Sequence, residues 1–216
     1  MMEPGPLGSP LVVTIPGPDG GMTSPTGVAT NATNGFVISA GGKAAASSEI
    51  FATEDGTLEG WNPNVDPSQA VVAVNKSPGG AVYKGLAIGF NESGAFLFAT
   101  NFHAGTIDVY DSNFRPVRLH GGFRDPHLPA GYAPFGIAAI NSKLYVTFAL
   151  QDKDRKTTLL ARDTGSSTSL ILRAISSSGS SARASSTHHG EWPGRPSRVS
   201  AASITRCLSV TSAMVL

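Results

Sequence analysis

Several features that would place a protein in a familiar class are scarce or missing in this sequence. Cys207 is the single cysteine among 216 residues, which excludes an internal disulfide and a zinc site made of several cysteines. Charged residues make up 14% of the chain and the formal net charge is +1, so no basic field indicates nucleic-acid binding. No apolar run approaches the roughly 20 residues that span a bilayer. Met1 to Pro10 lack the pattern of a signal peptide, and we expect none in this chain.

The short motifs of well-known enzyme classes are also missing. The sequence contains no G-x-S-x-G elbow, no H-E-x-x-H zinc motif, no P-loop and no G-x-G-x-x-G fingerprint. It therefore names no reaction, and we predict no cofactor.

Composition changes abruptly near Lys156. Residues 1–156 carry 15 of the 16 aromatic side chains, and the last sixty residues carry only Trp192. Those sixty residues contain 15 serines and six arginines but no lysine. They have too few large apolar groups to offset about 1–2 kcal/mol per residue of backbone ordering. We predict a folded region over 1–156 and a disordered or misfolded tail without a packed core over 157–216.

A repeat organises the first 156 residues. Each cycle opens on Gly, an aliphatic residue and Ala, at Gly27, Gly85 and Gly136, which are 58 and 51 residues apart. Second strands are expected at 36–40, 95–100 and 143–149, third strands at 56–61 and 105–110, and fourth strands at 70–75 and 114–119. Asp55-Gly56 is a typical hairpin turn, for which type I′ geometry is expected.

Cycles of four short strands are typical of propeller blades. The expected fold is all-β, an incomplete β-propeller of about two and a half to three four-stranded blades. Its terminal blades would expose sheet faces and strand edges, so we expect poor solubility.

Longer strings resemble a known family. FATEDGTLEGWNP (51–63), AVYKGLAIG (81–89), LFATNFHAGTIDVYDSNF (97–114), LPAGYAPFGI (128–137) and KLYVTFALQDKD (143–154) are similar to an uncharacterised family of exported bacterial proteins. Its members are NHL/TolB-like six-bladed β-propellers, often found beside PEP-CTERM sorting systems. The resemblance covers about residues 5–155. It implies a longer parent chain with a signal peptide, and an exported or extracellular location for that parent, but no established activity.

The tail has a second interpretation as the same gene read one base out of phase. In the neighbouring frame, the first two bases of a TCN serine codon follow the last base of the preceding codon, and the new codon encodes Phe, Leu, Ile or Val. A serine-rich tail in one frame is therefore an apolar segment in the other. In that frame Ser166–Ile171 can spell FVDVFD, which is similar to TIDVYD at 106–111. The alternative is a natural serine-rich linker.

Candidate binding residues lie in the loops that would form the ligand face of a propeller. Asn101 and His103 come just before a turn, and Asp152 belongs to an acidic loop. A histidine can act as a ligand or base, and aspartates can bind calcium, which also draws attention to Asp108 and Asp111. Hydrogen bonds to the local backbone are the simpler interpretation of all these side chains. No catalytic and no metal-binding residue is predicted.

Three functions remain open. The first is a binding or scaffold module whose partner is an unidentified small molecule or protein at the propeller face. The second is a metal-assisted hydrolase or lactonase, by analogy with other six-bladed propellers. The third is a non-functional product of a frameshifted gene.

Overall fold

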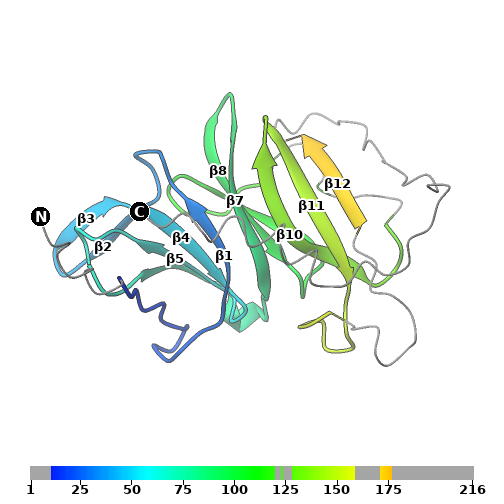
Figure 1. The fold of residues 1–216 in the computed structure, drawn as a ribbon, viewed down its shortest axis with the longest axis horizontal. Helices are drawn as coiled ribbons and strands as arrows, with labels where there is room; N and C mark the ends of the chain where they lie inside the picture. Colours follow the sequence, from blue (N-terminus) through cyan, green and yellow to red (C-terminus); the bar gives the residue numbers. More distant parts are fainter. Residues whose placement is uncertain (1–10, 120–122, 124–127, 159–170, 177–216) are drawn as a thin grey trace, which may run out of the picture. The chain divides into compact units, whose positions relative to one another are not determined.

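The computed structural model describes residues 11–119, 123, 128–158 and 171–176, the last of these as backbone. Its regular structure consists of antiparallel strands, apart from the 3-10 helix η1 (Ser77–Gly79). Three sheets follow one another along the chain (Figure 1), and we call them the first, second and third blades. The first blade has the order β1 (Pro25–Thr30), β4 (Glu49–Thr53), β5 (Thr57–Trp61), β6 (Val71–Asn75); the second β7 (Tyr83–Asn91), β8 (Gly94–Asn101), β9 (Thr106–Asp111); the third β10 (Tyr132–Ile140), β11 (Lys143–Leu150), β12 (Ile171–Ser176).

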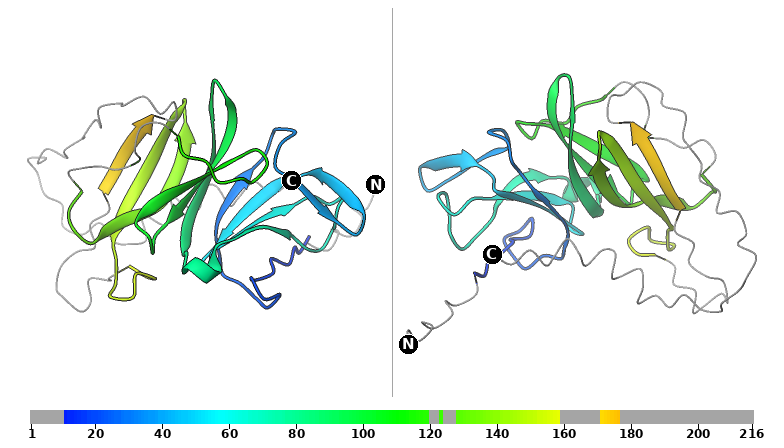
Figure 2. Two further views of the ribbon diagram at one scale, coloured as in Figure 1. Left: turned by 180° about the vertical axis from the view of Figure 1, so that it is seen from behind. Right: turned by 45° about the horizontal axis from the view of Figure 1, so that its top comes forward.

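Neighbouring blades pack against each other through apolar clusters. Between the first and second blades lie Ile50, Ala52, Leu58, Val74, Leu86, Leu97, Ala99 and Tyr110. Between the second and third lie Phe96, Phe98, Ile107, Val109, Leu144, Val146 and Phe148. Side chains alternate between the two faces along each strand, so the middle blade contributes to both clusters. Consecutive antiparallel sheets stacked in this way (Figure 2) are propeller blades. The predicted all-β, propeller-like fold is confirmed.

The repeated glycines lie where the first strands of neighbouring blades meet. A Cβ on Gly27 would lie 2.8 Å from the backbone nitrogen of Leu86, and one on Gly85 would lie 2.9 Å from the carbonyl oxygen of Phe135. The pairing register of β1, β7 and β10 with the second strand shifts beside each repeated glycine. The three strands therefore share a β-bulge, and only a residue without a side chain allows the backbones to come so close.

Threonine side chains also connect neighbouring blades. The Oγ1 hydroxyl of Thr26 donates to the carbonyl oxygen of Tyr83 at 2.7 Å, and that of Thr100 donates to the carbonyl oxygen of Phe135 at 2.6 Å. Each bond supplies a donor to a carbonyl oxygen at the register shift of the neighbouring blade. Blades thus meet through backbone contacts as well as apolar packing.

One predicted strand has a different role. Residues 36–40 were expected to form the second strand of the first blade, but β2 (Val37–Ala40) pairs only with β3 (Lys43–Ala46), as a separate hairpin. The second strand is β4, which pairs with both β1 and β5. The tight turn at Gly41 and Gly42, both with positive φ, pairs β2 with the strand that directly follows it, and β2 therefore does not join the sheet of the first blade.

The remaining strand predictions are confirmed with two exceptions. In the turn after β4 only Gly56 has positive φ (+82°), so the type I′ turn, which needs two such residues, was wrong. Residues 114–119 do not form a full fourth strand, since their contact with β9 is one bridge between Tyr110 and Pro116.

Most of the predicted tail, 157–216, lies outside the described residues. Within it, the backbone of β12 pairs antiparallel with β11 as the third strand of the third blade. Strand pairing of this kind uses backbone groups, which every reading frame supplies equally. The interpretation of the tail as a shifted frame therefore stays a prediction.

Candidate functional site

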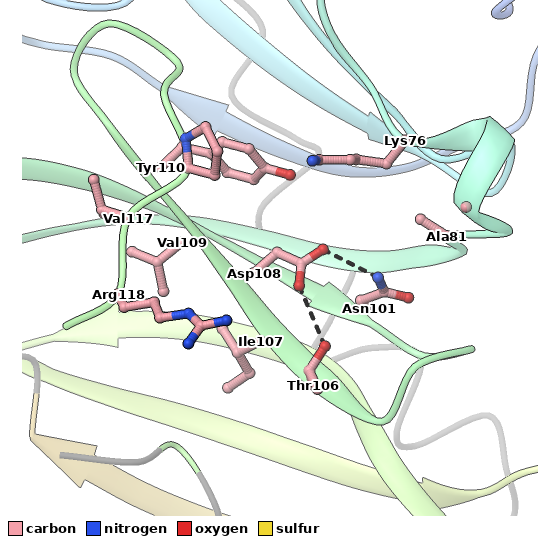
Figure 3. Close-up of a pocket in the computed structure, with 12 residues that line it drawn as sticks. Lys76, Ala81, Asn101, Thr106, Ile107, Asp108, Val109, Tyr110, Val117 and Arg118 are labelled. Atoms are coloured by element: carbon pink, nitrogen blue, oxygen red, sulfur yellow. Dashed lines mark hydrogen bonds between the residues drawn. The ribbon is translucent and has the colours of Figure 1, made fainter. Parts of the chain in front are cut away.

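A groove with a volume of about 630 Å³ runs along the outer edge of the second blade (Figure 3). Its apolar wall comes from Ile107, Val109 and Val117, and its charged side chains are Lys76, Asp108 and Arg118. Lys76 follows the last strand of the first blade, Asp108 lies on β9, and Arg118 lies on the segment that follows β9. The groove therefore collects groups from two blades.

The groove exists because the fourth strand of the second blade is short. Asp111 accepts hydrogen bonds on Oδ1 from the backbone nitrogens of Asn113 and Arg115, which turns the chain back beside β9. The nitrogen of Val117 then donates to the carbonyl oxygen of Val109 at 2.9 Å. No described residue pairs with the outer edge of β9 at Ile107, and this unpaired stretch lines the groove.

Asp108 is the centre of a hydrogen-bond network in the groove. Its Oδ1 accepts from the hydroxyl of Thr106 at 3.2 Å, and its Oδ2 accepts from the side-chain nitrogen of Asn101 at 3.0 Å. The hydroxyl of Tyr83 also donates to Oδ2, at 3.1 Å. Three donors thus hold one carboxylate, which fixes its orientation and occupies most of its capacity to accept hydrogen bonds.

The two tyrosines of the network have a defined proton order. Because a carboxylate only accepts, the single hydroxyl proton of Tyr83 belongs to its bond with Asp108. Tyr110, whose hydroxyl oxygen lies 2.9 Å from that of Tyr83, must then donate to it. Burial raises the pKa of Tyr83 far above its ordinary range and that of Tyr110 to about 12. Both are neutral at physiological pH, and the oxygen of Tyr110 keeps free acceptor capacity toward the groove.

Two cations lie in the groove without a carboxylate of their own. Within the described residues neither Lys76 nor Arg118 forms an ion pair. In Figure 3 the Lys76 ammonium points toward the Tyr110 hydroxyl, and the Arg118 guanidinium lies over Ile107 and Val109. With one carboxylate against two cations, the groove has a formal charge of +1.

The three predicted binding residues have different surroundings. Asn101 lines the groove and orients Asp108, while its Oδ1 accepts from the backbone nitrogen of Ala104 at 3.2 Å. His103 lies in the same turn, where its buried Nδ1 has no hydrogen-bond partner in the described part of the chain and its Nε2 lies 3.6 Å from the position of a Cβ on Gly80. Asp152 lies in the loop after β11.

Asp152 caps its own loop. Its Oδ1 accepts from the backbone nitrogen of Lys156 at 2.9 Å and its Oδ2 from the hydroxyl of Thr157 at 3.4 Å. Desolvation opposes ionisation, but the donors outweigh it and hold the pKa of Asp152 below its usual value. The neighbouring Gln151 side chain donates to the carbonyl oxygens of Phe102 and His103, so the two predicted loops do lie at one edge. Their role in ligand binding stays a prediction.

Sequence reasoning missed the two cations of the groove. Lys76 and Arg118 are 42 residues apart and belong to no motif. Asp108 and Asp111 were considered as calcium ligands, with hydrogen bonds to the local backbone as the simpler interpretation, and Asp111 does cap a turn. No three His, Cys, Asp or Glu side chains converge on a metal-sized site anywhere in the described chain. The same residues include no helix long and apolar enough to cross a membrane.

Comparisons with known proteins give relatives without an assigned function. No family model matches the chain. Three uncharacterised proteins of Acanthamoeba polyphaga mimivirus are similar: one is 35% identical over 54% of this chain, a second 36% over 64% and a third 32% over 59%. The aligned regions are only 22%, 37% and 32% of those relatives, so the chain spans well under half of each.

A gluconolactonase from Xanthomonas campestris is a structural neighbour. The likeness covers 74% of this chain and 46% of that one, with 14% identity and a TM-score of 0.49.

Proposed function

We propose that this chain is part of a β-propeller binding module and that the groove beside β9 takes a small organic anion. The observation that carries the proposal is the pair of cations, Lys76 and Arg118, in a groove that contains one carboxylate. A volume of about 630 Å³ suits a small molecule. Mostly apolar walls with a few polar groups are the usual lining of such sites.

The groove's chemistry suits binding better than catalysis. Arg118 offers a planar pair of donors to a carboxylate or phosphate, and Lys76 offers a point charge. Asp108 accepts three hydrogen bonds, and Tyr83 and Tyr110 keep their protons, so none of these groups is poised as a base. Ile107, Val109 and Val117 would contact the apolar body of the ligand.

The alternative is a metal-assisted hydrolase or lactonase, which needs carboxylates or amides from several blades around one ion. The activity of the whole parent protein stays open between these two functions. Metal-dependent ester or lactone hydrolysis by the full-length parent would favour the enzyme.

Titration of the chain with phenyl phosphate, followed by NMR or calorimetry, tests the binding module. Saturable binding is expected, and Lys76→Ala and Arg118→Ala should each weaken it by about tenfold, the loss of one charge-assisted contact. Lys143→Ala, which removes an exposed lysine from β11, is the matched control and should leave the affinity unchanged. Equal affinity in all four proteins would refute the groove as the site.

We also propose that the parent belongs to the exported NHL/TolB-like propellers associated with PEP-CTERM systems, and that residues 157–216 are its frameshifted continuation. The quoted strings over 51–154 support the first statement, and the serine-rich composition after Lys156 supports the second. The nucleotide sequence around codon 156 decides the matter. If the codons in the neighbouring frame do not encode strand-like segments, residues 157–216 are a natural linker. A complete reading frame without a signal peptide would contradict export.

A further inference from the structure

The third strands of the first and second blades share a pattern, Thr-x-acid-x-aromatic. It occurs as Thr57-Leu58-Glu59-Gly60-Trp61 on β5 and as Thr106-Ile107-Asp108-Val109-Tyr110 on β9. In both blades the threonine hydroxyl donates to one oxygen of the acid, at 2.8 Å for Glu59 and 3.2 Å for Asp108. The two acids are therefore equivalent positions of the repeat.

Their second oxygens have different surroundings. Oδ2 of Asp108 accepts from Tyr83 and Asn101, which pair with each other across β7 and β8. The equivalent pair across β1 and β4 is Pro25 and Thr53. Proline has no side-chain donor, so the first blade cannot repeat the bond from Tyr83.

Thr53 is committed elsewhere. The one hydroxyl proton of Thr57 goes to Glu59, so the bond of 2.7 Å between the hydroxyls of Thr53 and Thr57 takes its proton from Thr53. The result is an ordered relay, Thr53 to Thr57 to Glu59, which ends on Oε1. Among the residues that the structure describes, Oε2 of Glu59 has no hydrogen-bond partner, and Glu59 itself is 0% exposed.

An N-terminal strap, residues 11–24, covers the face of the first blade that bears Glu59. At the outer strand, the nitrogen of Ala70 donates to the carbonyl oxygen of Thr14 at 2.9 Å, just before β6. At the inner end, the nitrogen of Glu54 donates to the carbonyl oxygen of Ser24 at 3.0 Å, just after β4. The strap thus crosses the blade from its outer to its inner edge, beside β5 and β1 (Figure 1).

The strap must cross the Glu59 face because the other face is occupied. Leu58, which points to the opposite side of β5, packs in the cluster between the first and second blades. Pro16 and Gly17 are buried where the strap folds back on itself, through the bridge from Pro16 to Met22 and the bond from the Gly17 nitrogen to the Gly21 carbonyl oxygen. Glu59 therefore lies in a closed layer between its own sheet and the strap.

We propose that Glu59 is a pH-sensitive latch, which holds the strap closed as a neutral acid and releases it from the first blade on losing its proton. When Oε2 is protonated, the acid is neutral and costs little to bury. When Oε2 is ionised, it is a buried charge without a hydrogen-bond donor, which costs much more. Opening the strap admits water to the carboxylate and so removes that cost.

The charges around Glu59 act in the same direction. Desolvation raises the pKa of Glu59 to about 7, the Thr57 hydroxyl lowers it, and the negative charge of Asp55 raises it. The other acids on the same side are Glu49, which accepts a bond from Thr30, and the exposed Asp19 of the strap. No described lysine, arginine or histidine forms an ion pair with Glu59.

Hydrogen exchange of the full chain tests the latch, with the backbone amides of Thr14, Glu54 and Ala70 reporting on the strap. After correction for the intrinsic exchange rate, their protection should fall on the order of 100-fold between about pH 5 and about pH 8. Amides of β8 should keep their protection. A strap whose protection does not change over this range would refute the proposal.

Three variants identify the titrating group. Glu59→Gln keeps the size and the acceptor but cannot ionise, so its strap protection should not depend on pH, whereas the control Glu49→Gln should keep the wild-type change. Thr57→Val removes the donor that favours the carboxylate, and should move the transition to higher pH. This third variant decides the question if Glu59→Gln fails to fold. A wild-type transition in Glu59→Gln, or an unmoved or lowered one in Thr57→Val, would overturn the assignment.

Discussion

Gly27 and Leu86 meet backbone to backbone, so closely that a methyl group on Gly27 would lie 2.8 Å from the Leu86 nitrogen and 3.0 Å from its Cβ. Real Cβ contacts of this length essentially never occur, because neither a backbone nitrogen nor a buried Cβ can move aside without moving its strand. The contact fixes how near the first blade lies to the second.

Gly27→Ala should therefore destabilise the folded region. The added methyl group forces β1 away from β7, and overpacking of this kind costs about 1–3 kcal/mol of the free energy of unfolding. Denaturant unfolding followed by near-UV circular dichroism measures it. Gly79→Ala is the matched control, since a Cβ there meets nothing within 4 Å, and it should change stability by less than about 0.5 kcal/mol. Equal effects of the two substitutions would contradict the close approach.

Thr100→Val should weaken the contact between the second and third blades. The substitution keeps the shape of the side chain but removes the hydroxyl that donates to the carbonyl oxygen of Phe135 at 2.6 Å. A buried carbonyl left without a donor costs about 1–3 kcal/mol. The same unfolding measurement should show almost no loss for Thr30→Val, whose hydroxyl makes a solvent-exposed bond to Glu49. A neutral Thr100→Val would mean that the Phe135 carbonyl finds another donor.

Tyr83→Phe should weaken the hydrogen-bond network that holds Asp108 and Tyr110 in the groove. It removes a donor from Asp108 and the acceptor of the Tyr110 hydroxyl, so two bonds are lost with one oxygen atom. We expect a loss of about 2 kcal/mol in the free energy of unfolding and a weaker affinity for phenyl phosphate as Asp108 loses its orientation. The control is Tyr145→Phe on β11, a half-buried tyrosine outside the groove. An unchanged affinity for phenyl phosphate in Tyr83→Phe would show that the hydrogen-bond network does not contribute to ligand binding.

Glu59 should make the folded region less stable as the pH rises. Its pKa is about 7 in the folded state against 4.5 for an unperturbed glutamate, so the folded state binds the proton more tightly. Its contribution is flat below the unfolded pKa, is lost as the pH rises from about 4.5 to about 7, and is flat again above. The full difference is roughly 3 kcal/mol. Unfolding titrations of wild type and Glu59→Gln at several pH values measure it, and parallel curves would contradict the shifted pKa.

The repeat made much of this fold predictable from the sequence. Gly27, Gly85 and Gly136 marked three first strands. At Gly27 and Gly85 the backbone of the next blade leaves no room for a side chain, and a Cβ on Gly136 would lie 3.0 Å from the Thr147 hydroxyl oxygen. The β2–β3 hairpin was misplaced because strand signals are local, whereas membership of a sheet depends on which strand offers a free edge. Nothing near residue 37 reveals that β4 competes for the edge of β1.

The candidate site was harder to predict. Asn101 was selected for its place before a turn and does line the groove, but Lys76 and Arg118 were not selected. The groove forms because the second blade does not complete a fourth strand after Pro116. This feature differs from blade to blade, so the repeat does not predict it. The exceptional surroundings of Glu59 arise similarly, from a proline where the next blade has a tyrosine.

The glycine contacts between first strands bear on how such a chain diverges. Neighbouring blades are spaced there by main-chain atoms, which every substitution elsewhere leaves in place. Each blade is therefore free to change its outer strands, loops and charges without altering the angle at which the next one joins. Duplication of a blade, followed by independent change of its peripheral strands, is then an easy evolutionary route, because the glycine contacts between first strands keep the blades in place.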